Sequence, residues 1–322
     1  GIYFGIGISL MIGGLIVDGW NQAYPAGGPF GLVGWQAAFM AVGLPGIALA
    51  CVVALLREPV RGLIDGLPSP ASPTPFTEFG RELAAIIPPL TLISATRRGV
   101  KSGLTNLAVA ALAALIAWLL ILWTGAVWQW ACVAIGYYAV FSWASSLRSR
   151  DPASFACIWG SPAFWAVTLG YAAVAFINYS TAAFAAVYAR EVLQHSPADV
   201  GFWIGSSSAL SGFLGVILGG YASDRLSQKY RTGRLWVIAF GLVAPLPFIA
   251  IGFTLQPDGS SASLLHFTLM SAAANLFCTT ALGAAAAATQ DLVLPRMRGT
   301  ATATFFIGMT LIGLALGPYM AG

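Results

Sequence analysis

The chain has 322 residues, of which 58% are apolar and only 8% are charged. Soluble globular proteins carry about 25% charged residues, so this composition excludes an ordinary soluble domain and indicates a polytopic membrane protein. The formal net charge is +4 and the sequence pI is near 9.0. Because the basic residues fall between apolar runs, we attribute the excess to loops on one side of a membrane rather than to nucleic-acid binding.

Residue types that commonly bind metals or carry catalysis are sparse and scattered. The four cysteines (Cys51, Cys132, Cys157 and Cys278) lie in or beside apolar runs without CxxC spacing, which is typical of packed thiols. Neither histidine has a metal-binding neighbour at helical spacing. The sequence therefore predicts no catalytic residue, no metal site and no cofactor, and we do not expect an enzyme.

Apolar runs of about 20 residues predict membrane-spanning helices, and nine such spans can be placed. They are expected at residues 1–17, 35–56, two within 102–147, 162–189, 200–223, 235–255, 263–289 and 300–321. Thr124-Gly125 predicts the turn inside 102–147, and Ser196-Pro197 a helix start. Pro162 suits a first helical turn, and Pro245 with Pro247 predicts a kink. The chain opens and stops within apolar runs, so we expect both ends to be truncations.

The basic residues predict the orientation of these spans. If the loops alternate between the two sides of the membrane, one side holds fourteen of the 15 lysines and arginines and the other only Arg190. Cytoplasmic loops are enriched in lysine and arginine, so the basic side is expected to be cytoplasmic. Arg97, Arg98 and Lys101 stand just before the third span and suit contact with anionic lipid. A role in orienting that helix explains these basic residues equally well.

One short loop carries the most specific motif of the chain. Gly219-Gly220 ends an apolar run and leads to Asp224-Arg225, and Lys229, Arg231 and Arg234 follow before the next run begins. The pattern Gly-x-x-x-Asp-Arg followed by basic residues resembles the short cytoplasmic loop motif of the major facilitator superfamily of secondary transporters.

Three further stretches resemble the same superfamily. Gly5-x-Gly7 with Gly13-Gly14 resembles its glycine-rich fifth helix, and Gly34-Trp35-Gln36 with Arg57-Glu58-Pro59 resembles its sixth helix and exit. The stretch 290–301, leading to Gly313 and Gly317-Pro318, is most similar to the Spinster-like branch. The chain departs from the family pattern at Gln36 and at Ser227-Gln228, and the resemblance is absent over residues 64–150.

The resemblance implies an all-α membrane fold of major facilitator type with about nine transmembrane helices. Residues 1–63 would be the last two helices of an N-terminal bundle, 64–150 a cytoplasmic loop plus an inserted two-helix hairpin, and 151–322 five helices of a C-terminal bundle. The first four helices and the last would be missing. The glycine and small-residue repeats Gly5/Ser9/Gly13, Gly215/Gly219 and Gly313/Gly317 predict close helix contacts.

The implied function is secondary active transport of a small or amphipathic organic solute by alternating access, in the inner cell membrane. Export of a lipid or lysolipid is an alternative, because Spinster-like proteins include such exporters. A coupling ion, proton or sodium, would bind in the missing N-terminal helices. A transport-inactive receptor or partner subunit stays open as an alternative from another class. Expected partners are the substrate and membrane lipids, and no nucleic acid.

Candidate cavity residues are uncharged, because no acidic or basic residue falls near the middle of a predicted span. Two polar stripes each follow one helix face, namely Thr168, Tyr171, Asn178, Thr181 and Tyr188 in the fifth span and Ser271, Asn275 and Thr279 in the eighth. Hydrogen bonding between helices explains such stripes, and so does a cavity wall. The resemblance favours a wall, because these two spans match cavity-lining helices. We therefore predict Tyr171, Asn178, Thr181, Asn275 and Thr279 as substrate-cavity residues, with Asn178 and Asn275 foremost.

Asp224 is the predicted gating residue. A carboxylate at a helix end can accept backbone N–H groups from the N-terminus of another helix, where the dipole is positive. The resemblance places Asp224 near residues 299–301, with Arg225 and Arg298 close by, in a contact that forms in one state of the transport cycle and breaks in the other. The alternative interpretation is that Asp224 lies in a solvated turn and has no gating role.

Overall fold

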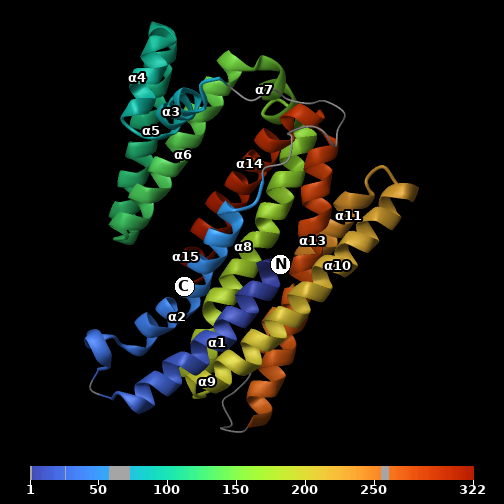
Figure 1. Ribbon diagram of the computed structural model, residues 1–322. Coiled ribbons are helices and arrows are strands. Elements are labelled where there is room, and N and C mark those ends of the chain that lie inside the picture. Colours follow the sequence, from blue (N-terminus) through green and yellow to red (C-terminus); the bar gives the residue numbers. More distant parts are fainter. Residues whose placement is uncertain (1, 26, 58–72, 255–260) are drawn as a thin grey trace. The chain divides into compact units, whose positions relative to one another are not determined.

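A computed structural model describes residues 2–25, 27–57, 73–254 and 261–322 (Figure 1). Throughout these ranges the regular structure is helical, without a β-strand. Nine helices in the described part are long and apolar enough to cross a membrane, which confirms the predicted fold class. Their bounds are Phe4–Ala23, Gly34–Ala54, Val100–Thr124, Val127–Arg150, Pro162–Glu191, Pro197–Lys229, Gly233–Gly252, Ser263–Asp291 and Pro295–Ala321.

The chain divides into two compact units. Unit 1 comprises residues 1–59, 170–288 and 312–322, and unit 2 comprises residues 60–169 and 289–311. Helix α8 (Pro162–Glu191) and the π-helical segment η4 (Met309–Leu314) each run from one unit into the other. The division into 1–63, 64–150 and 151–322 that the resemblance implies stays a prediction.

Unit 1 is built on close contact between α1 (Ile2–Ala23) and the continuous stretch of α9 (Pro197–Val200), the π-helical η2 (Gly201–Gly205) and α10 (Ser206–Lys229). A Cβ added at Gly7 would lie 2.4 Å from the Ala209 backbone nitrogen, and one at Gly205 would lie 2.8 Å from the Gly7 carbonyl oxygen. Gly14 meets Gly201 in the same way. Only glycine allows the two backbones to approach this closely.

The glycines in this contact differ in part from those predicted. A Cβ at Gly5 or Gly13 would meet nothing within 4 Å, so the expected α1 repeat was wrong, and Gly7 and Gly14 make the contact instead. A repeat at i, i+4 and i+8 does not by itself say which helix face is covered. The other two repeats are confirmed: Gly215 and Gly219 pack on α13 (Ser261–Asp291), and Gly313 and Gly317 on α8.

Several predicted helix boundaries are confirmed. Helix α8 begins at Pro162, and the hydroxyl of Ser196 accepts the backbone N–H of Asp199 at 3.1 Å to cap α9. The seventh span breaks into α11 (Gly233–Val243) and α12 (Leu246–Gly252) beside Pro245, where proline lacks the N–H that the helix would use.

Other boundaries were wrong. Helix α1 continues to Ala23, so Asp18 lies inside a helix expected to end at residue 17, and its carboxylate accepts the Gln22 amide at 3.0 Å. The stretch before the predicted hairpin, expected as a cytoplasmic loop beginning at residue 64, contains α3 (Pro75–Ile86) and α4 (Leu90–Arg97). The remaining helices of unit 1 are α2 (Gly34–Ala54), the short 3₁₀ turn η1 (Pro29–Gly31) and α15 (Ala315–Ala321).

Unit 2 contains an antiparallel hairpin of α5 (Val100–Thr124) and α6 (Val127–Arg150). The chain turns at Gly125, whose φ of +73° suits glycine, as the sequence predicted. Trp123 and Trp128, 82% and 83% exposed, flank this turn, where tryptophan commonly anchors a helix at the membrane surface. The unit also holds α7 (Pro152–Ile158), the 3₁₀ turn η3 (Pro295–Met297) and α14 (Arg298–Gly308).

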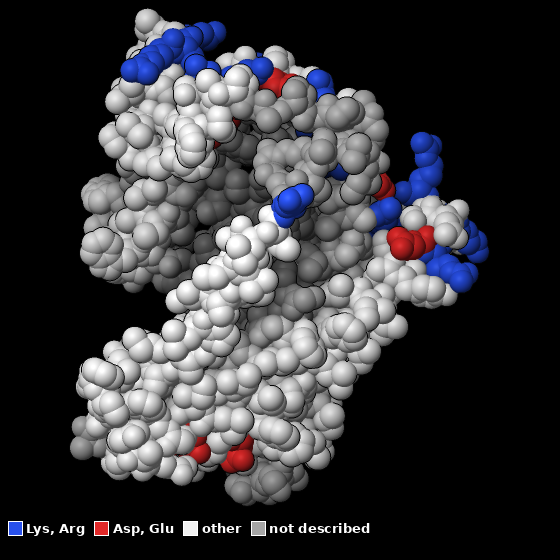
Figure 2. Space-filling model, viewed as in Figure 1, with Lys and Arg blue, Asp and Glu red and all other residues white. Residues whose placement is uncertain are grey.

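Charged side chains gather at helix ends, and the visible surface along the helices is almost free of them (Figure 2). The turn between α10 and α11 is the clearest case in unit 1, with Arg225, Lys229, Arg231 and Arg234 close together in the sequence. An uncharged belt between charged ends is the pattern that a bilayer imposes. The assignment of the basic side to the cytoplasm stays a prediction.

Replacing Gly7 with alanine tests the close contact of α1. We expect Gly7→Ala to lower the free energy of unfolding by about 2 kcal/mol, because its Cβ would overlap the backbone of α10. Gly5→Ala, in the same helix with open space around it, should be neutral or stabilising, because alanine favours helix. Thermal unfolding in detergent measures both, and equal melting temperatures would contradict the contact.

Candidate functional site

Unit 1 contains a partly open cavity of about 540 Å³, a volume typical of sites for small organic ligands. Five elements of the unit contribute most of its wall: α1, α2, α8, α13 and the stretch η2–α10. The residues that line it are Ile6, Gly7, Ser9, Leu10, Gly13, Val17, Trp35, Ala38, Phe39, Val42, Asn178, Tyr179, Thr181, Ala182, Ala185, Ile204, Ser208, Ser271, Ala274, Asn275 and Cys278. Most are apolar, and no aspartate, glutamate, lysine, arginine or histidine is among these lining residues.

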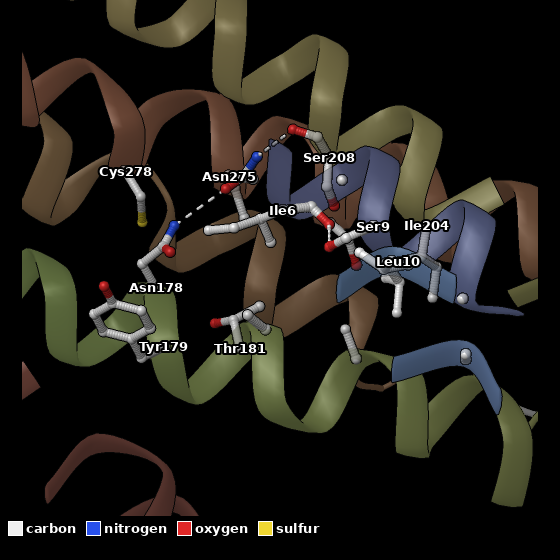
Figure 3. A pocket seen from close by; sticks show the side chains of 18 of the residues that line it. Ile6, Ser9, Leu10, Asn178, Tyr179, Thr181, Ile204, Ser208, Asn275 and Cys278 are labelled. Carbon is white, nitrogen blue, oxygen red and sulfur yellow. Dashed lines mark hydrogen bonds between the residues drawn. The ribbon is translucent and has the colours of Figure 1, made fainter. Parts of the chain in front are cut away.

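A hydrogen-bonded amide pair marks the polar part of the wall (Figure 3). The Asn178 side-chain amide on α8 donates to the Asn275 side-chain oxygen on α13 at 3.2 Å. The Asn275 amide in turn donates to the Ser208 carbonyl oxygen at 3.1 Å and to the Ser211 hydroxyl at 2.9 Å, both on α10. One asparagine thus connects three helices, and the Cys278 side chain lies beside Asn178 (Figure 3).

Three of the five predicted cavity residues line this cavity, namely Asn178, Thr181 and Asn275. Ser271, from the same predicted stripe as Asn275, lines it as well. The hydrogen bond between Asn178 and Asn275 also fits the alternative interpretation of the stripes as interhelical contacts. The role of this pair toward a substrate stays a prediction.

The other two predicted residues lie outside the wall. Tyr171 is 2% exposed, and Thr279 is fully buried with its hydroxyl donating to the Leu276 carbonyl oxygen at 3.0 Å. Thr279 fills the space left by Gly215 on α10, so it serves helix packing. The α8 stripe covers five helical turns, whereas the cavity borders only part of α8, so periodicity selects the right face but too long a stretch of it.

The predicted polar stripes do not include the cavity residues that α1, α2 and α10 contribute. Ser9, Trp35, Phe39 and Ser208 line the cavity but belong to no polar stripe on the two spans considered. The serine run 206–208 was the available signal for α10, because consecutive serines are unusual in a membrane span. Nothing local distinguishes Trp35 and Phe39 from lipid-facing aromatic residues.

The predicted gating residues lie on helix ends. Asp224 and Arg225 are exposed on the last turns of α10, and the Arg225 guanidinium lies 5.2 Å above the Tyr221 ring. The backbone carbonyl of Asp224 accepts the Ser227 hydroxyl at 2.9 Å. Arg298 is exposed at the start of α14 in unit 2. The expected contact of Asp224 with residues 299–301 stays a prediction.

The polar network predicts a measurable contribution to stability. We expect Asn275→Leu to lower the free energy of unfolding by about 1 kcal/mol, because three interhelical hydrogen bonds are lost. Thr181→Val, which keeps the shape of a lining side chain outside this network, should stay within about 0.5 kcal/mol of the original chain. Thermal unfolding in detergent compares them, and equal stability of the two variants would show that the network contributes little.

Comparisons with known proteins found one relative by sequence and two similar solved structures. No protein-family model matches the chain. Over 161 residues it is 27% identical to an MFS-type efflux pump of Mycolicibacterium smegmatis, an alignment that covers 50% of this chain and 36% of that protein.

Two solved structures are similar to the chain. The crystal structure of a bacterial homologue of the human lysosomal transporter Spinster, inward-facing and unoccupied, matches 98% of this chain and 52% of its own, with a TM-score of 0.57 and 21% identity. An inward-facing, occupied structure of a bacterial Spinster homologue matches 97% of this chain and 65% of its own, with a TM-score of 0.45 and 19% identity. The chain spans about a third of the efflux pump and about half of the unoccupied Spinster homologue. It shares the fold of that homologue. Together with the sequence similarity to an MFS-type efflux pump, this bears out the predicted resemblance to the major facilitator superfamily.

Proposed function

We propose that the chain forms part of a secondary active transporter that moves a small or amphipathic organic solute across a membrane by alternating access. The observation that carries this proposal is the cavity of about 540 Å³ inside unit 1, with its amide network, in a chain that has the fold of a Spinster homologue. The name "efflux pump" belongs to the M. smegmatis relative. It supports a transport function for this chain but does not identify a substrate.

The chemistry of the wall favours an uncharged or largely apolar substrate. An ion taken from water into this cavity would meet no lysine, arginine, aspartate or glutamate among the lining residues, and burial of an uncompensated charge is costly. Apolar side chains suit a hydrocarbon body, while Asn178 and Ser9 offer hydrogen-bonding groups. Export of a lipid or lysolipid is the second candidate, and the apolar wall is the observation that favours it.

The remaining parts of the proposal follow from the resemblance and the charge pattern. Asp224, Arg225 and Arg298 would form the cytoplasmic gate. A coupling ion, proton or sodium, would bind outside the cavity described here, because its lining residues include no carboxylate. The nine apolar helices found among the described residues support a multi-pass membrane protein, and we propose the inner cell membrane as its location.

Thiol labelling of the cavity tests the proposal directly. We expect cells that produce the protein to accumulate less of one or more compounds from a panel of neutral, lipophilic fluorescent molecules than cells without it. In the Thr181→Cys variant a bulky thiol reagent should abolish this difference, because it fills the cavity. Cys278 also lines the cavity, so it is replaced by serine in both chains, and the Cys278→Ser chain treated with the same reagent is the control for the remaining native cysteines. If the labelled variant transports as well as the unlabelled one, the cavity is not the substrate site.

Removing the charge of Asp224 tests the gate. We expect Asp224→Asn to lower the initial rate of transport about tenfold, because a neutral amide stabilises one state of the cycle less than a carboxylate does. Arg231→Gln, an exposed neighbour in the same turn, should transport at the original rate when membrane abundance is matched by immunoblot. Equal rates for the two variants would favour the solvated-turn interpretation.

A further inference from the structure

The guanidinium of Arg98, in the turn between α4 and α5, has no hydrogen-bond acceptor in the described part of the chain. All three of its nitrogen atoms have under 1 Å² of exposed surface. A shielded guanidinium normally has a carboxylate, a phosphate or several carbonyl oxygens around it. Its isolation here points to an anionic partner.

Neighbouring charges further raise the free-energy cost of leaving the charged Arg98 side chain without an anionic partner. Burial lowers the pKa of Arg98, the positive charge of Arg150 lowers it further, and Tyr138 acts in the opposite direction. The carboxylate of Glu82 is already engaged by Arg150 in two parallel hydrogen bonds, one of them 3.0 Å long. The carboxylate of Glu82 therefore pairs with Arg150, and no carboxylate among the described residues pairs with Arg98.

The excess of positive charge lies at one end of the hairpin. Residues 73–151 contain six basic and three acidic side chains, and none of them falls within 102–147. They therefore gather where α5 begins and α6 ends. Arg97 and Lys101 are exposed on either side of Arg98. Because α5 is long and apolar enough to span a membrane and starts at Val100, we expect this end at the level of the lipid headgroups.

Buried polar atoms without a partner continue from this point into the hairpin. The Ser102 hydroxyl and the Asn106 side-chain oxygen on α5, and the Ser142 hydroxyl on α6, have no hydrogen-bond partner among the described residues. Ser102 and Asn106 are one helical turn apart, and Ser142 is one turn from Tyr138. A ligand that carries both acceptors and donors, as a phosphate ester with a polar headgroup does, would suit this region.

Helix α3 adds an apolar surface beside the basic cluster. It packs on α4 and α6, with Ala85 only 1% exposed, whereas Phe76 and Phe79 are 88% and 62% exposed on another face. A short amphipathic helix with exposed aromatic residues beside a membrane-spanning hairpin is typical of one that lies in the interface with its apolar face among the lipid chains. This surface distinguishes a membrane lipid from a phosphate ion in water.

We propose that the α4–α5 turn of unit 2 is a binding site for the phosphate headgroup of an anionic membrane phospholipid, with Arg98 as its central ligand and the phenylalanine face of α3 against the acyl chains. The guanidinium fork suits two phosphate oxygens, and Arg97 and Lys101 add electrostatic attraction. Arg98 would turn outward from its shielded position to meet the phosphate, and the missing carboxylate partner favours that movement. The site is separate from the cavity of unit 1 and does not depend on transport.

Lipid retention tests the site. The full chain is reconstituted in nanodiscs of phosphatidylcholine with or without phosphatidylglycerol, and native mass spectrometry counts the phosphatidylglycerol molecules that stay bound. We expect Arg98→Gln to lower retention about fivefold, because the phosphate loses the guanidinium fork that would hold two of its oxygens. Arg231→Gln, which removes an exposed cation from unit 1, should retain lipid as the original chain does. Equal retention by both variants would overturn the proposal.

Two further arms separate lipid from free phosphate and from misfolding. Phosphatidylglycerol should raise the unfolding temperature of the original chain and raise that of Arg98→Gln markedly less, because only a ligand bound to the folded state stabilises it. Inorganic phosphate in phosphatidylcholine nanodiscs should leave both unfolding temperatures unchanged. If phosphate raised the unfolding temperature of the original chain as much as phosphatidylglycerol does, the assignment to lipid would be overturned. Phe79→Ser, which alters no charge, should also lower retention; unchanged retention would overturn the role of α3.

Discussion

Direct backbone contact between α1 and the stretch η2–α10 is the constraint on which unit 1 depends. Inside a bilayer, burial of apolar side chains gives helices little reason to associate, because lipid chains are equally apolar, so packing and small residues decide. Gly7 and Gly14 on one side meet Gly205 and Gly201 on the other. This contact fixes the face of α1 that carries Ser9 and Leu10 beside Ile204 and Ser208, and it thereby shapes one wall of the cavity.

The irregular backbone of η2 lies at the point where this contact and the cavity wall meet. A π-helical turn shifts the register of the helix after it and is common at functional sites. Here it comes directly before the serine run whose last member, Ser208, offers its carbonyl oxygen to Asn275. The turn thus sets which carbonyl of α10 reaches α13. Packing on α1 and hydrogen bonding to α13 therefore act on adjacent turns of one helix, so a shift of η2 would change both.

The sequence specifies span number, helix starts and turns because each has a local cause: hydropathy, proline at Pro162, glycine at Gly125. It also draws attention to Asn178 and Asn275, because an amide side chain in an apolar run needs a hydrogen-bond partner. Each of the two polar stripes contains such an amide, and the two amides pair with each other. It does not separate Thr279 from Asn275, four residues apart on one stripe, because the glycine of another helix decides which is covered. Nor does it find α3, whose twelve residues are too few for a span and follow a proline-rich stretch.

Two buried polar side chains, Asn275 in unit 1 and Arg98 in unit 2, differ in whether their hydrogen bonds are satisfied. In unit 1 the amide of Asn275 is uncharged and its donors are satisfied by α10, so the network adds stability without further partners. In unit 2 the charge of Arg98 has no such compensation among the described residues, and a guanidinium cannot escape the cost by losing its proton at physiological pH. An uncharged network can remain inside a bilayer indefinitely, whereas a lone cation at the headgroup level is stable only with an anion beside it. The anionic lipids of the bilayer itself are the most abundant source of one.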